Sequence, residues 1–219
     1  MRTPRYVRLL LACVLLSSEG ISQNLFTPAA SCSTTSVGLI PINDLGTGYY
    51  QGYQGGLYPG GFNVRPALHD SAGRALAALV LPRDTSGNVD LVGGKIVLLS
   101  IGMSNATQEF SVFKQLADAD TMKNPKLVIV DGAQGGQTAA IISNPNAQFW
   151  RVIDQRLAAA GVTRAQVQAA WVKEANANPT EGFPRHAQIL DSQFVLIARI
   201  LKQFYPNIRL AYWSSRIYG

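Results

Sequence analysis

A serine follows directly on an apolar run in the middle of the chain. The run Ile96–Ile101 is followed by Gly102, Met103 and Ser104. A serine placed where a buried strand ends and a helix begins can act as a nucleophile, because the free N–H groups of the helix stabilise the negative charge formed in acyl transfer. Serine is also a preferred helix cap, a role that needs no chemistry. The segment alone leaves both interpretations of Ser104 open.

Two glycines follow the next apolar run. After Leu127–Val130 the chain reads Asp-Gly-Ala-Gln-Gly-Gly, which places Gly135 and Gly136 near the end of the predicted strand. Glycines at such a position expose backbone N–H groups to an oxyanion or another anion, although a plain tight loop would have the same composition. The spacing matches neither the dinucleotide-binding nor the Walker A glycine pattern, so we do not expect nucleotide binding.

Polar residues follow the third apolar run. Glu174, Asn176 and Asn178 come directly after Val167–Val172. An asparagine side chain can supply a further N–H group to an oxyanion, whereas an Asx turn leading into Pro179 would explain the same residues without a ligand.

The elements between these runs predict the architecture. A fourth apolar run follows at Ile208–Trp213, and helical patterns separate the runs, at Asn105–Asp120, Phe149–Ala160 and Pro184–Phe204. Buried strands that alternate with helices predict parallel βαβ units and a three-layer α/β/α domain. Ligands of such sheets bind at the C-terminal ends of the strands, where the serine, the glycines and the asparagines are expected to meet.

The order Ser, Gly, Asn after three consecutive strands resembles the SGNH (GDSL-like) hydrolase superfamily. Gly102–Ala106 is most similar to the first block of its sialate O-acetylesterase and acetylxylan-esterase-like branch, and 131–136 and 171–176 are similar to the second and third blocks. The resemblance covers about residues 95–219 and implies a flavodoxin-like fold without a cofactor. It also implies hydrolysis of small-molecule or carbohydrate esters, often acetyl esters, with Ser104 as the nucleophile.

In that family the oxyanion is held by the backbone N–H of the serine, by a glycine of the second block and by the asparagine of the third. These positions correspond to Ser104, to Gly135 or Gly136, and to Asn176. The third block lacks the family's glycine before the asparagine, which leaves Asn176 and Asn178 as alternatives.

The family's catalytic histidine lies in an Asp-x-x-His block after a fifth strand, and no such block follows Leu210. We therefore expect a C-terminally incomplete chain that lacks the last strand and helix, with impaired turnover. His186 and Glu174 are the candidates within the chain for a base or a substrate contact. The alternative function is a non-catalytic, exported glycan- or peptide-binding protein on the same fold.

The first residues have the layout of a secretory signal peptide. Arg2, Arg5 and Arg8 precede the short apolar run Leu9–Leu16, and small residues follow. The layout predicts cleavage near Ser22 and a secreted or periplasmic protein. The run is too short to span a bilayer, and its cysteine comes too early for lipid anchoring to be expected.

Residues 23–94 are expected to form a Gly/Tyr-rich arm with one helix at Pro66–Leu81 and a linker. Repeated Tyr-Gln-Gly units make Tyr50 and Tyr53 candidates for an aromatic lip of the substrate site, the alternative being an arm with a purely structural role. Residues 95–219 then form the hydrolase-like domain. The net charge of +6 includes no run of basic residues, so nucleic acid is not an expected partner, and the two histidines and two cysteines form no metal-binding pattern. The oligomeric state and the identity of the ester stay open.

Overall fold

The computed structural model describes residues 40–215. These residues fall into two compact units, and the boundary in the sequence lies between Asn63 and Val64. The predicted signal peptide, residues 1–22, lies outside the described residues. The first unit contains the short helix α1 (Ile42–Leu45) and a hairpin of β1 (Tyr49–Tyr50) and β2 (Tyr53–Gln54).

The hairpin explains the repeated Tyr-Gln-Gly pattern. Gln51 and Gly52 form its two-residue turn with φ values of 48° and 84°. Positive φ at both central positions matches the right-handed twist of the flanking strands. Tyr50 and Tyr53 are directly paired across the two strands.

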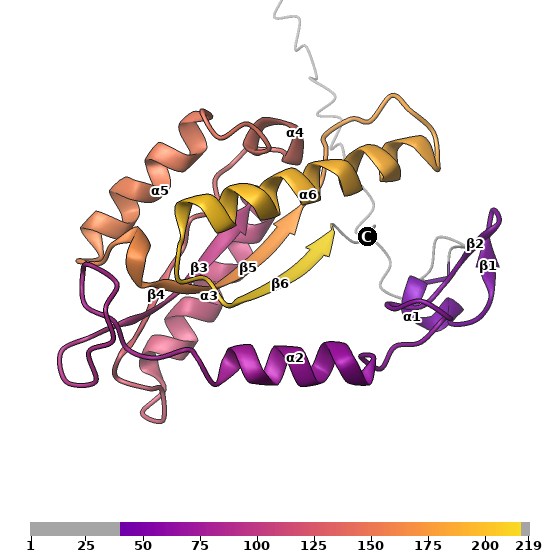
Figure 1. Cartoon of the computed structure of the whole chain (residues 1–219). Coiled ribbons are helices and arrows are strands. Elements are labelled where there is room, and N and C mark those ends of the chain that lie inside the picture. Colours follow the sequence, from indigo (N-terminus) through magenta and orange to yellow (C-terminus); the bar gives the residue numbers. More distant parts are fainter. Residues whose placement is uncertain (1–39, 216–219) are drawn as a thin grey trace, which may run out of the picture. The chain divides into compact units, whose positions relative to one another are not determined.

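The second unit is an α/β domain around a four-stranded parallel sheet with the order β4-β3-β5-β6. The strands are β3 (Ile96–Gly102), β4 (Leu127–Val130), β5 (Val167–Glu174) and β6 (Leu210–Ser215). Each of the four predicted apolar runs forms one of them, and the strand order follows the flavodoxin-like pattern. Figure 1 shows the strands pointing in the same direction.

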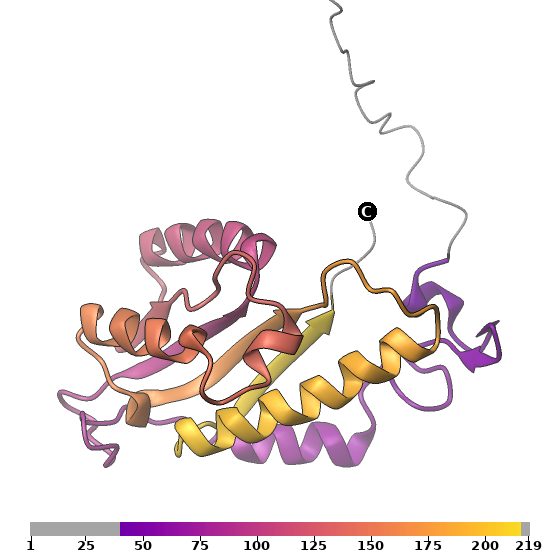
Figure 2. The same ribbon diagram turned by 90° about the horizontal axis from the view of Figure 1, so that it is seen from above.

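The predicted helices precede the sheet or connect its strands. They are α2 (Ala67–Ala77), α3 (Ser104–Ala119), α5 (Gln148–Ala159) and α6 (Arg185–Phe204), to which the structure adds the short α4 (Ala139–Ile142) and the 3-10 turn η1 (Arg164–Gln166). Helices α4, α5 and α6 cover one face of the sheet, and α2 and α3 lie on the other (Figures 1 and 2). The expected three-layer arrangement is confirmed.

The two faces of the sheet are packed differently. On the side of α5 and α6, the core buries the alternate β3 side chains Val97, Leu99 and Ile101 against Trp150 and Ile197. On the side of α3, the β3 residue Leu98 and the β5 residue Trp171 are only partly buried. The apolar pattern predicts a sheet covered on both faces, whereas one face is covered incompletely.

The segment before β3 belongs to the same unit as the sheet. The Gln168 side chain of β5 accepts the Leu81 N–H and donates to the Leu81 carbonyl, and Arg83 pairs with Lys95 through two backbone hydrogen bonds. The second unit begins at Val64, earlier than the expected start of the hydrolase-like domain at residue 95. None of the helices among residues 40–215 is both long and apolar enough to cross a membrane.

Candidate functional site

The loop that follows β4 is fixed by a cluster of hydroxyl and carboxylate groups. Ser100 of β3 donates its hydroxyl to Asp131 Oδ1 at 2.5 Å, and Thr107 of α3 donates to the other oxygen of the same carboxylate. The Ser100 hydroxyl oxygen accepts the N–H groups of Gly132 and Ala133 at 3.0 and 3.2 Å. Asp131 thus joins β3, α3 and the start of the loop in one partly buried network.

Two further side chains hold the same loop, Arg156 from α5 and Gln134 from within the loop. One nitrogen of the Arg156 guanidinium donates to the carbonyl oxygens of Asp131 and Ala133, both at 2.8 Å. The Gln134 amide donates to the carbonyls of Gly132 and Phe149, and the Gln134 N–H donates to the Gly102 carbonyl at 2.8 Å. The loop is therefore bonded to the C-terminal end of β3.

Ser104 is the first residue of α3 and is exposed. Met103 occupies the cap position, and no side chain caps the helix. The interpretation of Ser104 as a helix cap is therefore wrong. Within the described part of the chain, the Ser104 hydroxyl has no hydrogen-bond partner. The serine stands at the positive end of a sixteen-residue helix, with its hydroxyl uncommitted.

The structure brings Gly135 against this serine. A methyl group placed on Gly135 would lie 3.8 Å from the Cβ of Ser104. Gly136 follows with a φ of 73°, a conformation that favours glycine. The two predicted segments, the helix start and the glycine pair, are therefore neighbours at the C-terminal edge of the sheet.

Most backbone N–H groups of the loop donate hydrogen bonds, but a few have no acceptor. From residue 132 to residue 140, every N–H donates a hydrogen bond except those of Gly135 and Gly136, for which the described residues offer no acceptor. The Ser104 N–H likewise has no acceptor there, as expected in the first turn of a helix. Three uncommitted N–H groups thus lie on two touching segments, an arrangement able to bind an anionic oxygen.

Asn176 has a different environment from the one predicted. Its Oδ1 accepts the Ala140 N–H at 3.1 Å, and its Nδ2 donates to Gln193 Oε1 at 2.6 Å. The side chain therefore ties α4 to α6, and only its second N–H could serve a ligand. Asn178, the alternative, is exposed and has a φ of 47°.

A pocket of about 410 Å³ lies beside this asparagine. Its lining mixes polar and apolar residues and comes from the start of α4, the loop after β5 and the start of α6: Thr138, Ala140, Asn176, Ala177, Asn178, Pro179, Thr180, Glu181, His186 and Ile189. The His186 Nδ1 atom is buried there without a hydrogen-bond partner in the described structure. Ser104 does not line this pocket, but Gly135 and Thr138 are only three residues apart, a span of at most about 11 Å between their Cα atoms.

Glu174 ends β5 as a buried carboxyl group. It is 1% exposed, and neither carboxyl oxygen has a hydrogen-bond partner in the described part of the molecule. Burial raises the pKa of Glu174 from 4.5 to about 8, while the nearby Ala175 N–H lowers the pKa slightly without reaching hydrogen-bond geometry. At neutral pH the group holds its proton, which makes it a poor proton acceptor.

The remaining candidates are Tyr50 and Tyr53, which lie in the first unit and are partly exposed. Among residues 40–215 no three His, Cys, Asp or Glu side chains are grouped so that they could hold a metal ion.

The groups that hold the loop were not among the predicted site residues: Ser100, Asp131, Thr107 and Arg156. Two of them carry a signal. Ser100 is the polar residue inside the apolar run of β3, and Asp131 is the first residue after β4. Arg156 and Thr107 lie on helices where charged and hydroxyl residues are ordinary, so their role depends on the tertiary structure.

The fold and the site together define an α/β protein with an open parallel sheet and a candidate anion-binding site at the C-terminal edge of its strands. Comparisons with protein-family models, with curated proteins and with solved structures found no match.

Proposed function

We propose that this chain is a serine ester hydrolase of the SGNH type, with Ser104 as the nucleophile. The observation that carries the proposal is the contact of Gly135 with Ser104, which places the uncommitted N–H groups of Ser104, Gly135 and Gly136 and the uncommitted Ser104 hydroxyl on two touching segments. The fixed loop supports it further, since donors held in place before the reaction stabilise an oxyanion without reorganising.

In the proposed reaction, Ser104 Oγ attacks the carbonyl carbon of an ester, and the three N–H groups receive the negative oxygen. The new Ser–acyl bond forms as the bond to the alcohol breaks. The serine proton passes to a base and then to the leaving alcohol, and water releases the acid by the reverse sequence.

The two candidate bases within the chain differ in their support. The protonated, buried state of Glu174 does not support it as the proton acceptor. His186 has an unpartnered ring nitrogen in the neighbouring pocket, which suits a contact to the alcohol part of the substrate. We therefore assign His186 to substrate binding and assign the role of base to neither residue, so added imidazole serves as the base in the test.

The test compares p-nitrophenyl acetate turnover of the protein with that of Ser104→Ala. We expect the variant to fall to the buffer rate. Added imidazole, an exogenous base, should raise the rate of the protein above the imidazole background measured with the variant. The matched control is Ser111→Ala, another exposed serine of the same helix, whose turnover should not change. Equal rates for the protein and Ser104→Ala would refute the assignment.

A second candidate function is binding of a glycan without turnover. The pocket beside Asn176 favours it, since amide, hydroxyl and imidazole groups are among its lining residues and none of the described residues that line it is lysine or arginine. Soluble acetylated xylan should then bind to Ser104→Ala as well as to the parent protein, and His186→Gln should weaken binding. Calorimetric titration measures this, and binding that is lost in Ser104→Ala alone would exclude the second candidate.

A further inference from the structure

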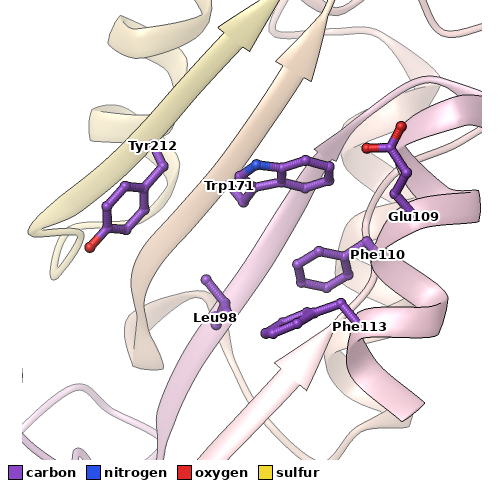
Figure 3. A pocket seen from close by; sticks show the side chains of 6 residues that line it. All are labelled: Leu98, Glu109, Phe110, Phe113, Trp171 and Tyr212. Atoms are coloured by element: carbon purple, nitrogen blue, oxygen red, sulfur yellow. The ribbon is translucent and has the colours of Figure 1, made fainter. Parts of the chain in front are cut away.

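A second pocket, of about 350 Å³, lies on the incompletely covered face of the sheet. Figure 3 shows its lining side chains, which come from β3, β5, β6 and α3: Leu98, Glu109, Phe110, Phe113, Trp171 and Tyr212. Helix α3 covers only part of this face, so these aromatic side chains meet around a space that no other described segment fills.

The lining is aromatic and has little polar character. The rings of Phe110 and Trp171 are nearly parallel, with an angle of 13° between their planes and 5.6 Å between their centres. The single charged group, Glu109, is already paired with Lys173 at 2.5 Å, and the Tyr212 hydroxyl points away from the other side chains in Figure 3. A charged ligand would leave water here without gaining a partner, which is costly.

This pocket is distinct from the site at Ser104. Successive residues of an α-helix are rotated by about 100°, so Phe113, nine positions after Ser104, projects from the opposite side of α3. Ser104 contacts the loop after β4, whereas Phe113 and Glu109 face β5 and β6. A ligand held in the pocket would not occupy the hydrolytic site.

The size of the pocket limits the ligand. A cavity of about 150 Å³ in another protein holds benzene, so a volume more than twice as large accommodates two fused rings. Flat rings pack well against aromatic side chains in offset stacks. We propose that this pocket binds a neutral, flat, hydrocarbon-rich molecule of about two fused rings, independently of ester hydrolysis.

The experiment uses two fluorescent probes that share one aromatic body. N-phenyl-1-naphthylamine is neutral, and 1-anilinonaphthalene-8-sulfonate carries the same rings with a sulfonate. We expect saturable binding of the neutral probe with quenching of tryptophan emission, and binding at least tenfold weaker for the sulfonate. Trp171→Phe should reduce the quenching and keep the binding.

Phe113→Ala should weaken binding of the neutral probe by about tenfold. Leu116→Ala, a control on the same helix at a side chain that is 69% exposed and does not line the pocket, should change it by less than twofold. Ser104→Ala should bind the probe unchanged, which separates this proposal from the proposed hydrolase.

Equal binding by Phe113→Ala and Leu116→Ala would overturn the proposal. Equal affinity for the two probes would overturn it as well. The proposal would also fail if the protein lost probe binding at high protein concentration while its sedimenting mass increased. The last result would assign this face to a second copy of the chain.

Discussion

Glu174→Gln is expected to make the protein more stable at pH 8 and above, and to leave its stability unchanged near pH 4.5. In the folded protein, burial raises the pKa of Glu174 from 4.5 to about 8. Between these values the folded state retains a proton that the unfolded state has released, so the stability conferred by the neutral form is lost as pH rises. The loss is about 1.4 kcal/mol for each pH unit and stops above pH 8.

Urea unfolding of both proteins between pH 4.5 and pH 9 measures this difference. The two free energies of unfolding should diverge steadily and reach a gap of several kcal/mol at the alkaline end. Glu181→Gln is the matched control, because Glu181 lies on an exposed loop and the substitution removes the same charge. Parallel pH profiles for Glu174→Gln and the parent protein would contradict the expectation.

Asp131→Ala is expected to destabilise the protein by about 2–4 kcal/mol. The substitution removes the acceptor of the Ser100 and Thr107 hydroxyls and of the Ala133 N–H. Ser100 is 0% exposed, so its hydroxyl would be left unpaired away from water, which is the costly part of losing a hydrogen bond.

Asp118→Ala provides the comparison. Asp118 forms ion pairs with Lys114 and Lys123 at the surface of the domain, and such exposed pairs contribute at most about 1 kcal/mol. Thermal and urea unfolding should rank Asp131→Ala well below Asp118→Ala. Hydrogen exchange should also become faster at the N–H groups of Gly132 and Ala133. Equal stability losses in the two variants would show that the network does not hold the loop.

The strands and the main helices could be predicted because their signals are local. Four apolar runs separated by helical patterns are enough to indicate a parallel sheet in which helices connect successive strands. The short α4 was missed because four residues of Ala and Ile carry no helical period. The incomplete cover of one face was missed because Leu98 and Trp171 have the same apolar character as fully buried residues.

The candidate site was predictable in part for a related reason. Ser104 and the glycine pair follow consecutive strands, so topology alone brings them to one edge of the sheet. The environment of Asn176 depends on Gln193, which is distant in sequence and sits on a helix with many polar residues. The charge state of Glu174 depends on how deeply its carboxyl group is buried. The position of a glutamate at the end of an apolar strand does not predict that burial.

The two hydrogen bonds from Arg156 have one further consequence. The guanidinium holds the carbonyl ends of the peptide groups that follow Asp131 and Ala133, and the N–H ends of these groups are taken by Ser100 and Gly102. Four contacts thus prevent these two peptide dipoles from rotating. An anion arriving at Gly135 and Gly136 would meet a loop whose conformational entropy has already been lost in folding, so little of its binding free energy would be consumed in ordering the backbone.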